Sequence, residues 1–192
     1  MKKILALLTL APLAALAEPQ SWSIDPAHSQ ATFSVRHMVI STVRGAFQKT
    51  SGTVKIDETD LSRSSVEATI DAASVDTRVE QRDGHLRSPD FFDVAKYPNI
   101  TFKSTKVEKA AAGKLKVTGD LTIHGVTKSV VLDVEGPTEA IKDGKGLRRG
   151  LTATTSINRQ DYGLKWNKMV EAGPIVGDEV KIEIEAEIVA AG

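Results

Sequence analysis

The segment EVKIEIEAEIVAA, residues 179–191, indicates the class of fold because apolar and polar residues alternate along most of its length. Its alternating apolar residues are Val180, Ile182, Ile184, Ala186 and Ile188. The positions between them hold lysine and glutamate. Because successive side chains of a β-strand point to opposite faces, this period of two predicts a strand with one buried and one exposed face.

The same alternation recurs along the chain and predicts about eight strands. They are expected within residues 31–39, 43–56, 66–70, 100–102, 115–123, 130–134, 151–157 and 180–188. Consecutive strands with one apolar face make an antiparallel sheet, and closure of the sheet removes its exposed edges. We therefore predict an all-β fold with a short helical insertion, in the form of an eight-stranded antiparallel barrel. A two-sheet sandwich shows the same alternation and is the alternative.

One segment, RDGHLRSPDFFDVAKYP (82–98), interrupts the alternation. Thr77 and Glu80, just before it, have the spacing of a capping box and predict that a helix begins there. Ser88-Pro89 is typical of the start of a second helical turn, which would contain Phe91-Phe92. The segment is interpreted either as an active site or as a lid over a hollow barrel.

Charged residues of this helix favour no single function. Arg78, Arg82 and His85 recur at three- and four-residue spacing and are expected on one face, and Asp83 and Arg87 have the spacing of an ion pair. Such a cluster has the groups needed for acid–base chemistry. No nucleophile or metal motif accompanies it, so charges that pair among themselves and with the barrel rim are the favoured interpretation.

A second unusual segment is NRQDYGLKWNK, residues 158–168. An Arg159–Asp161 pair is expected to tie a turn at a strand end. Tyr162 and Trp166 would then either plug one end of the barrel or lie at the mouth of a cavity, where amphipathic rings suit a boundary between water and an apolar interior.

The first residues predict export. Lys2 and Lys3 precede an apolar run that ends in the small-residue triplet Ala15-Leu16-Ala17. This is the pattern of a secretory signal peptide, residues 1–17, and the apolar run is shorter than the roughly 20 residues that span a bilayer. An uncleaved anchor is the alternative. Residues 18–192 then form one domain, without an integral membrane segment.

Composition excludes several classes of function. The sequence has 25 Lys and Arg, 25 Asp and Glu and no cysteine. Loss of the two N-terminal lysines leaves a slight acidic excess, which offers no electrostatic case for binding nucleic acid. An exported chain without disulfides fits a bacterial periplasm, and thiol catalysis is ruled out. The four histidines show none of the common metal-binding spacings. No cofactor or metal is therefore expected, and a metal site assembled from distant strands is the alternative.

Several pieces of the chain together resemble the YceI-like family of bacterial secreted proteins. They are WSIDPAHSQATFSVRHM (22–38), GAF and SGTVKID (within 45–57), RDGHLRSPDFFDVAKYPNITFKS (82–104), GDLTIHGVTKSVVLDV (119–134) and NRQDYGLKW (158–166). The resemblance implies a lipocalin-like barrel around an apolar tunnel that binds a polyisoprenoid or another long-chain lipid. It also implies a homodimer, and it favours the lid over the active site for residues 82–98.

The leading hypothesis is a periplasmic carrier of an isoprenoid lipid such as a quinone, a quinone precursor or a polyprenol, without enzymatic activity. Alternation and size predict the lining as Phe33, Val35, Phe47, Val66, Ile70, Phe91, Phe92, Phe102, Leu121, Ile123 and Leu132. Arg78, Arg82 and His85 are predicted to receive the head group, with Tyr162 and Trp166 at the mouth. The alternatives are a lipid-modifying enzyme that pairs His85 or His37 with Asp83, and a solid-barrel stress protein without a ligand.

Overall fold

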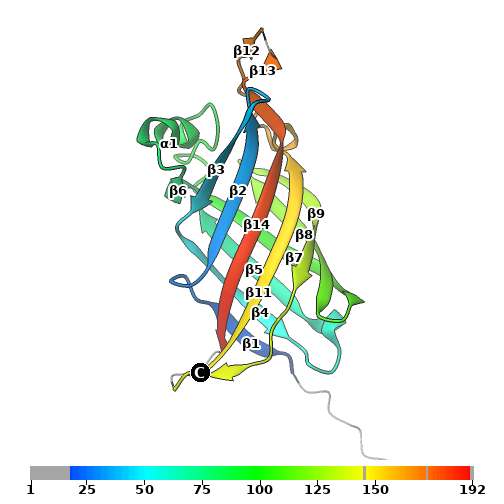
Figure 1. Cartoon of the computed structure of the whole chain (residues 1–192). Helices are drawn as coiled ribbons and strands as arrows, with labels where there is room; N and C mark the ends of the chain where they lie inside the picture. Colours follow the sequence, from blue (N-terminus) through cyan, green and yellow to red (C-terminus); the bar gives the residue numbers. More distant parts are fainter. Residues whose placement is uncertain (1–17, 145, 172, 191–192) are drawn as a thin grey trace, which may run out of the picture.

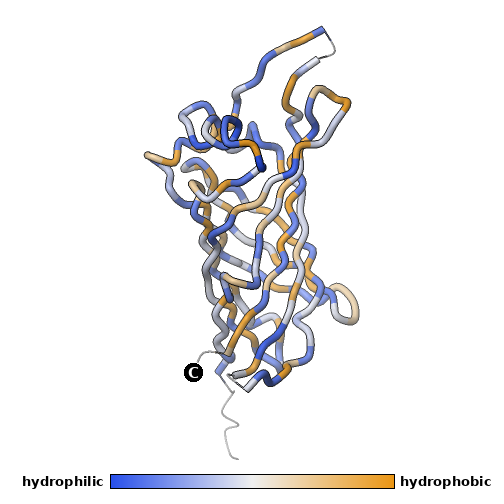
Figure 2. Tube along the Cα trace, turned by 60° about the vertical axis from the view of Figure 1, so that its left-hand side comes forward, coloured by the Kyte–Doolittle hydropathy of each residue, from blue (hydrophilic) through white to orange (hydrophobic). Residues whose placement is uncertain are grey.

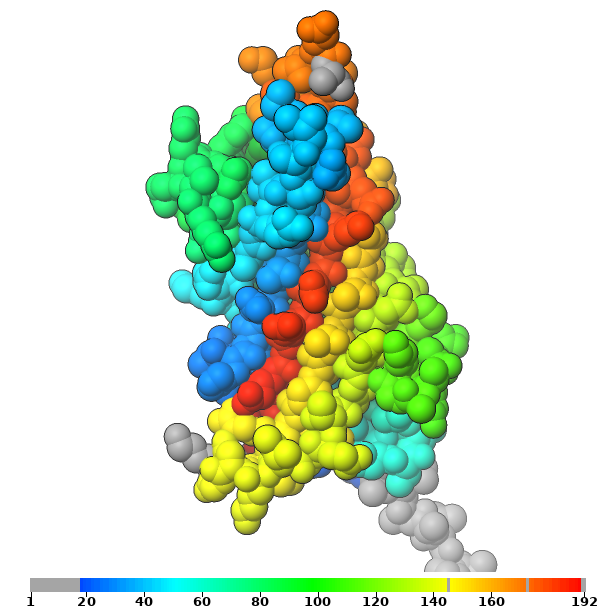
Figure 3. Space-filling model, in the orientation of Figure 1, coloured from blue at the N-terminus to red at the C-terminus, as the bar shows by residue number. Residues whose placement is uncertain are grey.

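The computed structural model describes residues 18–144, 146–171 and 173–190, and the predicted signal peptide, residues 1–17, lies outside them. The chain forms an elongated antiparallel β-barrel (Figure 1). One short helix, α1 (Glu80–Arg87), lies beside the upper end of the barrel, where it stands out from the wall in Figure 3. "Upper" here means the end with α1, and "lower" the end with the first strand.

Eight strands close the barrel, as predicted. Around the ring they are β1 (Gln20–Ile24), β4 (Thr50–Ile56), β5 (Ser65–Asp71), β7 (Asn99–Ala111), β8 (Lys114–Ile123), β9 (Val126–Glu135), β11 (Leu147–Asn158) and β14 (Val176–Ala190). The ring closes because β14 pairs with β11 along most of its length and with β1 at its lower end. The predicted barrel is thereby confirmed over the sandwich.

The upper part of the wall is built differently. There β14 pairs with β2 (Gln30–His37), and β2 pairs with β3 (Ser41–Phe47). The other edge of β3 pairs only at Ala46 and Phe47, with the two-residue strand β6 (Val75–Asp76). Side chains of residues 80–94, rather than a strand ladder, therefore cover the wall between β3 and β5.

Short elements complete the chain. They are the 3-10 turns η1 (Leu61–Arg63), η2 (Ala72–Ser74) and η3 (Arg159–Tyr162) and the strands β10 (Ile141–Lys142), β12 (Met169–Val170) and β13 (Gly173–Pro174). β12 and β13 form a hairpin that projects from the upper end (Figure 1). Among the described residues, no helix is long and apolar enough to cross a membrane.

Two strand predictions need correction. The segment 43–56 is not one strand, because Gln48 and Lys49 separate β3 from β4. Their backbone N–H groups donate to the carbonyl and the hydroxyl oxygen of Ser74, respectively, and not to a neighbouring strand. Strand β1 was not predicted, although its Trp22 is fully buried against Ile56 and Ile188 at the lower end.

The predicted capping box is also wrong. Helix α1 begins at Glu80, and the residue at its N-cap is Val79, which makes no side-chain cap bond. Thr77 is buried, and its hydroxyl and backbone N–H both donate to the Asp83 carboxylate. Ser88-Pro89 does begin a turn, as predicted: the Ser88 hydroxyl accepts from the N–H of Asp90, and the Ser88 carbonyl accepts from the N–H of Phe91.

Figure 2 shows hydrophobic and hydrophilic residues alternating along the strands, and in β8 the burial alternates with the same period, which gives the strand an inner and an outer face. Inward side chains of β7, β8 and β9 form a buried cluster at mid-barrel with Val107, Val117 and Leu132. A larger cluster around Phe47, Ile100 and Leu121 fills the upper barrel wall. The core is therefore a lining that follows the barrel from one end to the other.

Gly119 on β8 is required by the ring of Phe102. A Cβ at this position would lie 2.4 Å from Cζ of Phe102 and 2.6 Å from the carbonyl oxygen of Lys103. Gly119→Ala is expected to lower the free energy of unfolding by about 1–3 kcal/mol, since the ring and the backbone must both shift. Urea unfolding followed by circular dichroism measures the change.

Gly84→Ala is the matched control for this substitution. Gly84 is exposed in α1 with no atom within 4 Å of an added Cβ, so the change is expected to stabilise the fold by about 0.5–1 kcal/mol. Equal effects of the two substitutions would contradict the close approach of Phe102 to Gly119.

Candidate ligand-binding site

A cavity of about 270 Å³ lies inside the barrel. All eight strands of the ring contribute to its lining, together with β2, β3 and α1. On β14 alone the lining runs from Val176 to Ala186, which spans roughly 30 Å at about 3.3 Å per residue. The cavity is therefore long and narrow, and its shape suits a chain more than a compact molecule.

All of the apolar residues predicted to face the interior line this cavity. They are Phe33, Val35, Phe47, Val66, Ile70, Phe91, Phe92, Phe102, Leu121, Ile123 and Leu132. The structure thus brings them together around one space, and their contact with a ligand stays a prediction. Ile24 also lines the cavity and was missed because β1 was not predicted. The cavity itself contradicts the alternative of a solid barrel.

Two groups of aromatic rings connect the segment after α1 to the barrel. Phe92 packs against Phe47, which packs against Phe33, with ring centroids 5.6 Å and 5.7 Å apart. The ring of Phe91 lies 5.3 Å from that of Trp166, and both contact His85. Trp166 therefore lies behind Phe91 at the upper end and not in the lining, and its place at a cavity mouth stays a prediction.

Polar contacts tie α1 to the barrel rim. The Arg87 guanidinium donates to the carbonyl oxygens of Ala73 and Val75 at 3.0 Å and 3.1 Å. Arg82 donates to the hydroxyl and the carbonyl of Thr77 at 2.7 Å and 2.9 Å. The predicted polar contacts between the helix and the rim are therefore present, and most of them are hydrogen bonds to backbone carbonyl oxygens.

The predicted pairing within the helix is wrong. Asp83 is buried and bound to Thr77, which lies on the rim, so it is not available to Arg87. Arg87 pairs with Glu80 at 3.2 Å. Arg78 is exposed and lines an outer groove, and neither it nor Arg82 nor His85 lines the cavity. The three residues therefore lie outside the apolar space.

His85 is not paired with Asp83. Its Nε2 lies 2.8 Å from a carboxylate oxygen of Asp90, and its ring stands edge-on to Phe91 and Trp166. His37, the other predicted base, ends β2, where it is opposite Ser41. The acid–base pair required by the enzyme hypothesis is therefore not assembled.

Arg159 is the only charged residue in the cavity lining among the described residues. Its guanidinium donates to the carbonyl oxygens of Leu164, Trp166, Val176 and Gly177 and to the carboxylate of Asp178. Asp178, and not the predicted Asp161, is its ion-pair partner, at 3.0 Å. These contacts match the five N–H donors of an arginine, so no donor remains for a ligand in the cavity.

Tyr162 lies in the core and not at a cavity mouth. Its side chain is buried beside Ile157 and Leu164, and its hydroxyl has no hydrogen-bond partner among the described residues. Burial raises the pKa of Tyr162 to about 12. The structure therefore corrects the predicted role of Tyr162, which stabilises the upper end from behind the lining.

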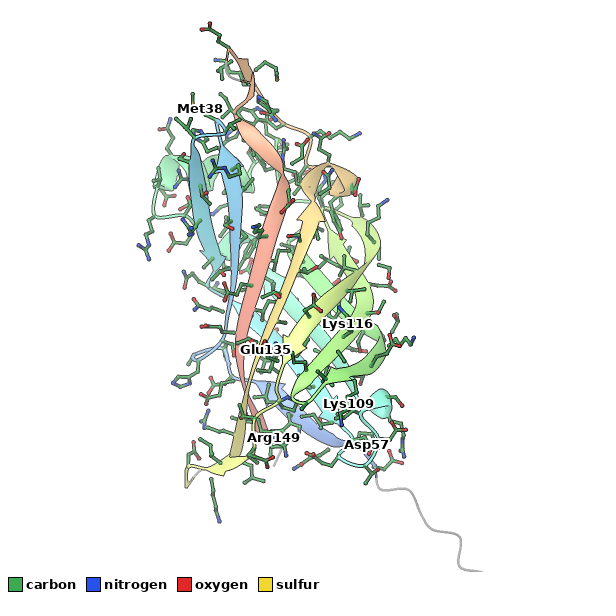
Figure 4. The ribbon with its side chains drawn as sticks, turned by 45° about the vertical axis from the view of Figure 1, so that its right-hand side comes forward. Met38, Asp57, Lys109, Lys116, Glu135 and Arg149 are labelled. Carbon is green, nitrogen blue, oxygen red and sulfur yellow. The ribbon has the colours of Figure 1, made fainter. Side chains whose placement is uncertain are left out.

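The lower end holds a charged cluster that was not predicted. Asp25, His28 and Glu187 lie close enough to share a cation, but the Arg148 guanidinium already bonds to Asp25, at 2.7 Å, and to Glu187. Hydrogen bonds from Arg148 and His28 hold the pKa of Asp25 well below its usual range. Nearby Arg149, labelled in Figure 4, lies over the ring of Trp22. The contacts of Arg148 tie the turn after β1 to β11 and β14 at the lower end.

The fold and its lining can be compared with known proteins. Residues 22–188 match the YceI-like domain. The chain belongs to the YceI-like family. A UPF0312 protein of Vibrio parahaemolyticus is 35% identical over 184 residues, which cover 96% of this chain and 93% of the relative. The family and the lipocalin-like barrel implied by the sequence are thereby confirmed.

Two solved structures share the barrel. BcnA of Burkholderia cenocepacia is 28% identical, with a TM-score of 0.74 over 85% of this YceI-like chain and 98% of BcnA. A polyisoprenoid binding domain from Saccharophagus degradans, implicated in plant cell wall breakdown, is 21% identical, with a TM-score of 0.65 over 90% of this chain and 99% of that domain. At 21% identity, the comparison with the Saccharophagus degradans domain shows that the two proteins share a fold.

The buried hydroxyl of Tyr162 generates a prediction about alkaline pH. An unfolded chain gives tyrosine a pKa of about 10, so between about pH 10 and 12 the native state keeps a proton that the unfolded state loses. The free energy of unfolding should fall as the pH rises through this window. Tyr162→Phe is expected to remove that part of the fall and to be nearly neutral at pH 7, because the hydroxyl has no partner to lose.

Urea unfolding at neutral pH and at several values between about pH 10 and 12 measures both effects. The unaltered protein, measured at the same pH values, is the reference for this substitution. An unchanged alkaline fall in Tyr162→Phe would count against the buried phenol as its source.

Proposed function

We propose that this YceI-like protein binds a long-chain isoprenoid lipid, such as a quinone, a quinone precursor or a polyprenol, with the tail inside the barrel. The observation that carries the proposal is the long cavity, whose lining is almost entirely apolar and whose one arginine has all its donors engaged. Such a space shields an apolar chain from water and offers a charged ligand no free ion-pair partner.

The energetics of transfer support an apolar cargo. Removing apolar surface from water gains roughly 25 cal/mol per Å², so a few hundred Å² yields several kcal/mol before the cost of association. Apolar walls distinguish ligands that differ by a methylene by only about 1–3 kcal/mol. We therefore expect preference for a class of lipid and weak selection of chain length.

The comparisons add limited support for the ligand class. The Saccharophagus degradans protein is described as a polyisoprenoid binding domain, and its likeness to this chain is one of fold. The apolar lining carries the argument from that fold to a lipid in this protein. Catalysis is not part of the proposal, because His85 and Asp83 are engaged with different partners.

We infer that the lipid head group lies at the upper end, outside the cavity. The lining offers it no free charged donor, whereas Arg82 and His85 lie on the segment that carries Phe91 and Phe92, and Arg78 lies just before that segment. In this arrangement, residues 82–98 act as a lid, with the two phenylalanines on the apolar side and the polar side chains outside the cavity.

The setting proposed for this function is the periplasm. The signal pattern of residues 1–17 would deliver the protein there, and an insoluble lipid needs a carrier in that aqueous space. Assembly as a homodimer is part of the same proposal and rests on the family resemblance. Analysis of the exported protein should therefore be made under native conditions, where a dimer is retained.

Native mass spectrometry of the exported protein, followed by solvent extraction, tests the proposal. We expect one long-chain isoprenoid per chain and a chain that begins at Glu18. Ala153→Leu should reduce the bound lipid about tenfold, because Ala153 is buried in the lining and the larger side chain enters the cavity.

Thr154→Leu adds a leucine at the next position of β11, which is exposed, and should leave the bound lipid unchanged. A lipid-free mass that does not change after incubation with quinones and polyprenols would sink the carrier proposal. Equal loss of lipid in the two variants would show that the effect is not one of cavity volume.

The lid proposal has its own test. Phe92→Asp places a charge against Phe47 in the lining and is expected to lower lipid content about tenfold while the far-UV circular dichroism is kept. Val79→Asp introduces the same charge at the exposed start of α1, where an aspartate is a favourable cap, and should keep the lipid. Lipid retained in folded Phe92→Asp would remove the case for a lid.

A further inference from the structure

Two neighbouring turns at the upper end expose large apolar side chains. Val39 and Ile40, between β2 and β3, are 59% and 79% exposed, and Met169 in the β12–β13 hairpin is 70% exposed. Figures 2 and 3 show both turns projecting beyond the barrel, on the side of the molecule where Figure 4 labels Met38. We call Val39, Ile40 and Met169 the apical patch.

The two turns are joined at their base. The backbone N–H of Met38 donates to the carbonyl oxygen of Ile175 at 2.8 Å, and His37 is in register with Val176. The Ile175 N–H in turn donates to the carbonyl of Lys168. The apical patch is therefore presented by one connected structure and not by two independent loops.

The backbone beneath the patch is strained. Met38 and Val39 have φ values of 48° and 64°, in the left-handed region that β-branched residues rarely adopt. Val39 falls within the strand predicted at residues 31–39, but β2 ends at His37 and the turn that follows exposes Val39. An exposed valine gains no burial within the chain that would offset this strain, and such strain is concentrated at functional sites.

The charged residues near the patch favour binding to an anionic surface. Within residues 36–41 and 165–171, the exposed charged side chains are Arg36, Lys165, Lys168 and Glu171. The Arg36 guanidinium donates to the carbonyl oxygen of Val39 and so lies directly beside the patch. Exposed apolar side chains with an excess of cations in the adjoining segments have the composition of an interfacial membrane anchor, since each cation near anionic lipid adds to the attraction.

We propose that the apical patch docks this protein on an anionic phospholipid bilayer, with Val39, Ile40 and Met169 in the interfacial layer. The patch is small, and three side chains supply far less than the about 800 Å² per partner of a standard protein interface. A bilayer needs no such area, because a few apolar side chains and cations suffice for reversible binding. The proposal goes beyond lipid binding in the cavity and does not depend on it.

Docking has a consequence for the lid. Trp166 belongs to the segment that leads into the β12–β13 hairpin, and it contacts both Phe91 and His85. A bilayer in contact with the patch would therefore lie next to the rings of Trp166 and Phe91 at the upper end of the cavity. A lipid could then pass between the bilayer and the cavity without crossing water. This consequence, unlike the docking itself, rests on the proposed function.

Flotation with vesicles tests the docking. The vesicles contain three parts phosphatidylethanolamine to one part phosphatidylglycerol, and vesicles of phosphatidylcholine alone give the uncharged reference. The double variant Ile40→Glu, Met169→Glu should lower the bound fraction about tenfold or more, since two apolar side chains leave the interface and two anions replace them. The unaltered protein should bind the uncharged vesicles several-fold less.

Ile141→Glu is the matched control. Ile141 is 64% exposed, but it lies at the lower end, opposite Arg148 in the β10–β11 pair. Vesicle binding should survive this substitution. Equal loss in both variants, no binding by the unaltered protein, or a dimer that only the double variant dissociates would each overturn the proposal.

Quenching of tryptophan fluorescence by brominated phospholipids gives the orientation. Trp166 lies near the patch, whereas Trp22 is fully buried at the lower end. Quenching should occur in the unaltered protein and disappear in Trp166→Phe, and persistence in that variant would overturn docking through the upper end. Protein stripped of lipid is tested in parallel, so vesicle binding without any cargo would uphold docking even if the carrier proposal failed.

Discussion

Strand β14 is the element on which the rest of the structure depends. It pairs with β11 through most of its length, with β1 at the lower end and with β2 above. Because one strand serves two successive neighbours on the same side, the lower ring and the upper wall share a single continuous inner face. The alternation of β14 therefore sets which side chains enter the barrel at every level, and the apolar lining follows from it.

The upper end shows how a charged group can be kept in such a lining. Arg159 is held there by the carbonyls of the segment that follows it and by Asp178, and its contacts fix the path of residues 163–168. Burial alone lowers the pKa of Arg159, and the charge of Asp178 opposes that shift. The arginine thus positions Trp166 behind Phe91 without offering a polar contact to the cavity. An arginine held in this way is compatible with the apolar ligand that we propose.

Sequence patterns predicted what depends on side-chain direction and missed what depends on distant partners. The period of two placed the lining correctly, since inward residues of a closed barrel must meet. It could not reveal β1, whose five residues QSWSI contain one fully buried side chain, Trp22. The capping box failed because Thr77 finds a carboxylate on the next turn. The partner of Arg159 is Asp178, far along the chain, whereas local spacing favoured Asp161. The alternation of apolar and polar residues does not depend on how much space the inward side chains leave, so a hollow and a solid barrel have the same sequence pattern.

The wall between β3 and β5 has an energetic consequence. On that side β3 makes ladder contacts only at Ala46 and Phe47, and the rest is covered by α1 and the turn after it. Separating β2 from β3, or β4 from β5, would break a continuous ladder, whereas here the bonds to be broken are chiefly those of Arg82, Arg87 and Asp83 to the rim. The barrel thus has one lateral panel whose displacement leaves the remaining wall intact. A chain-like molecule could enter or leave through its side, without passing end-on through the whole tube.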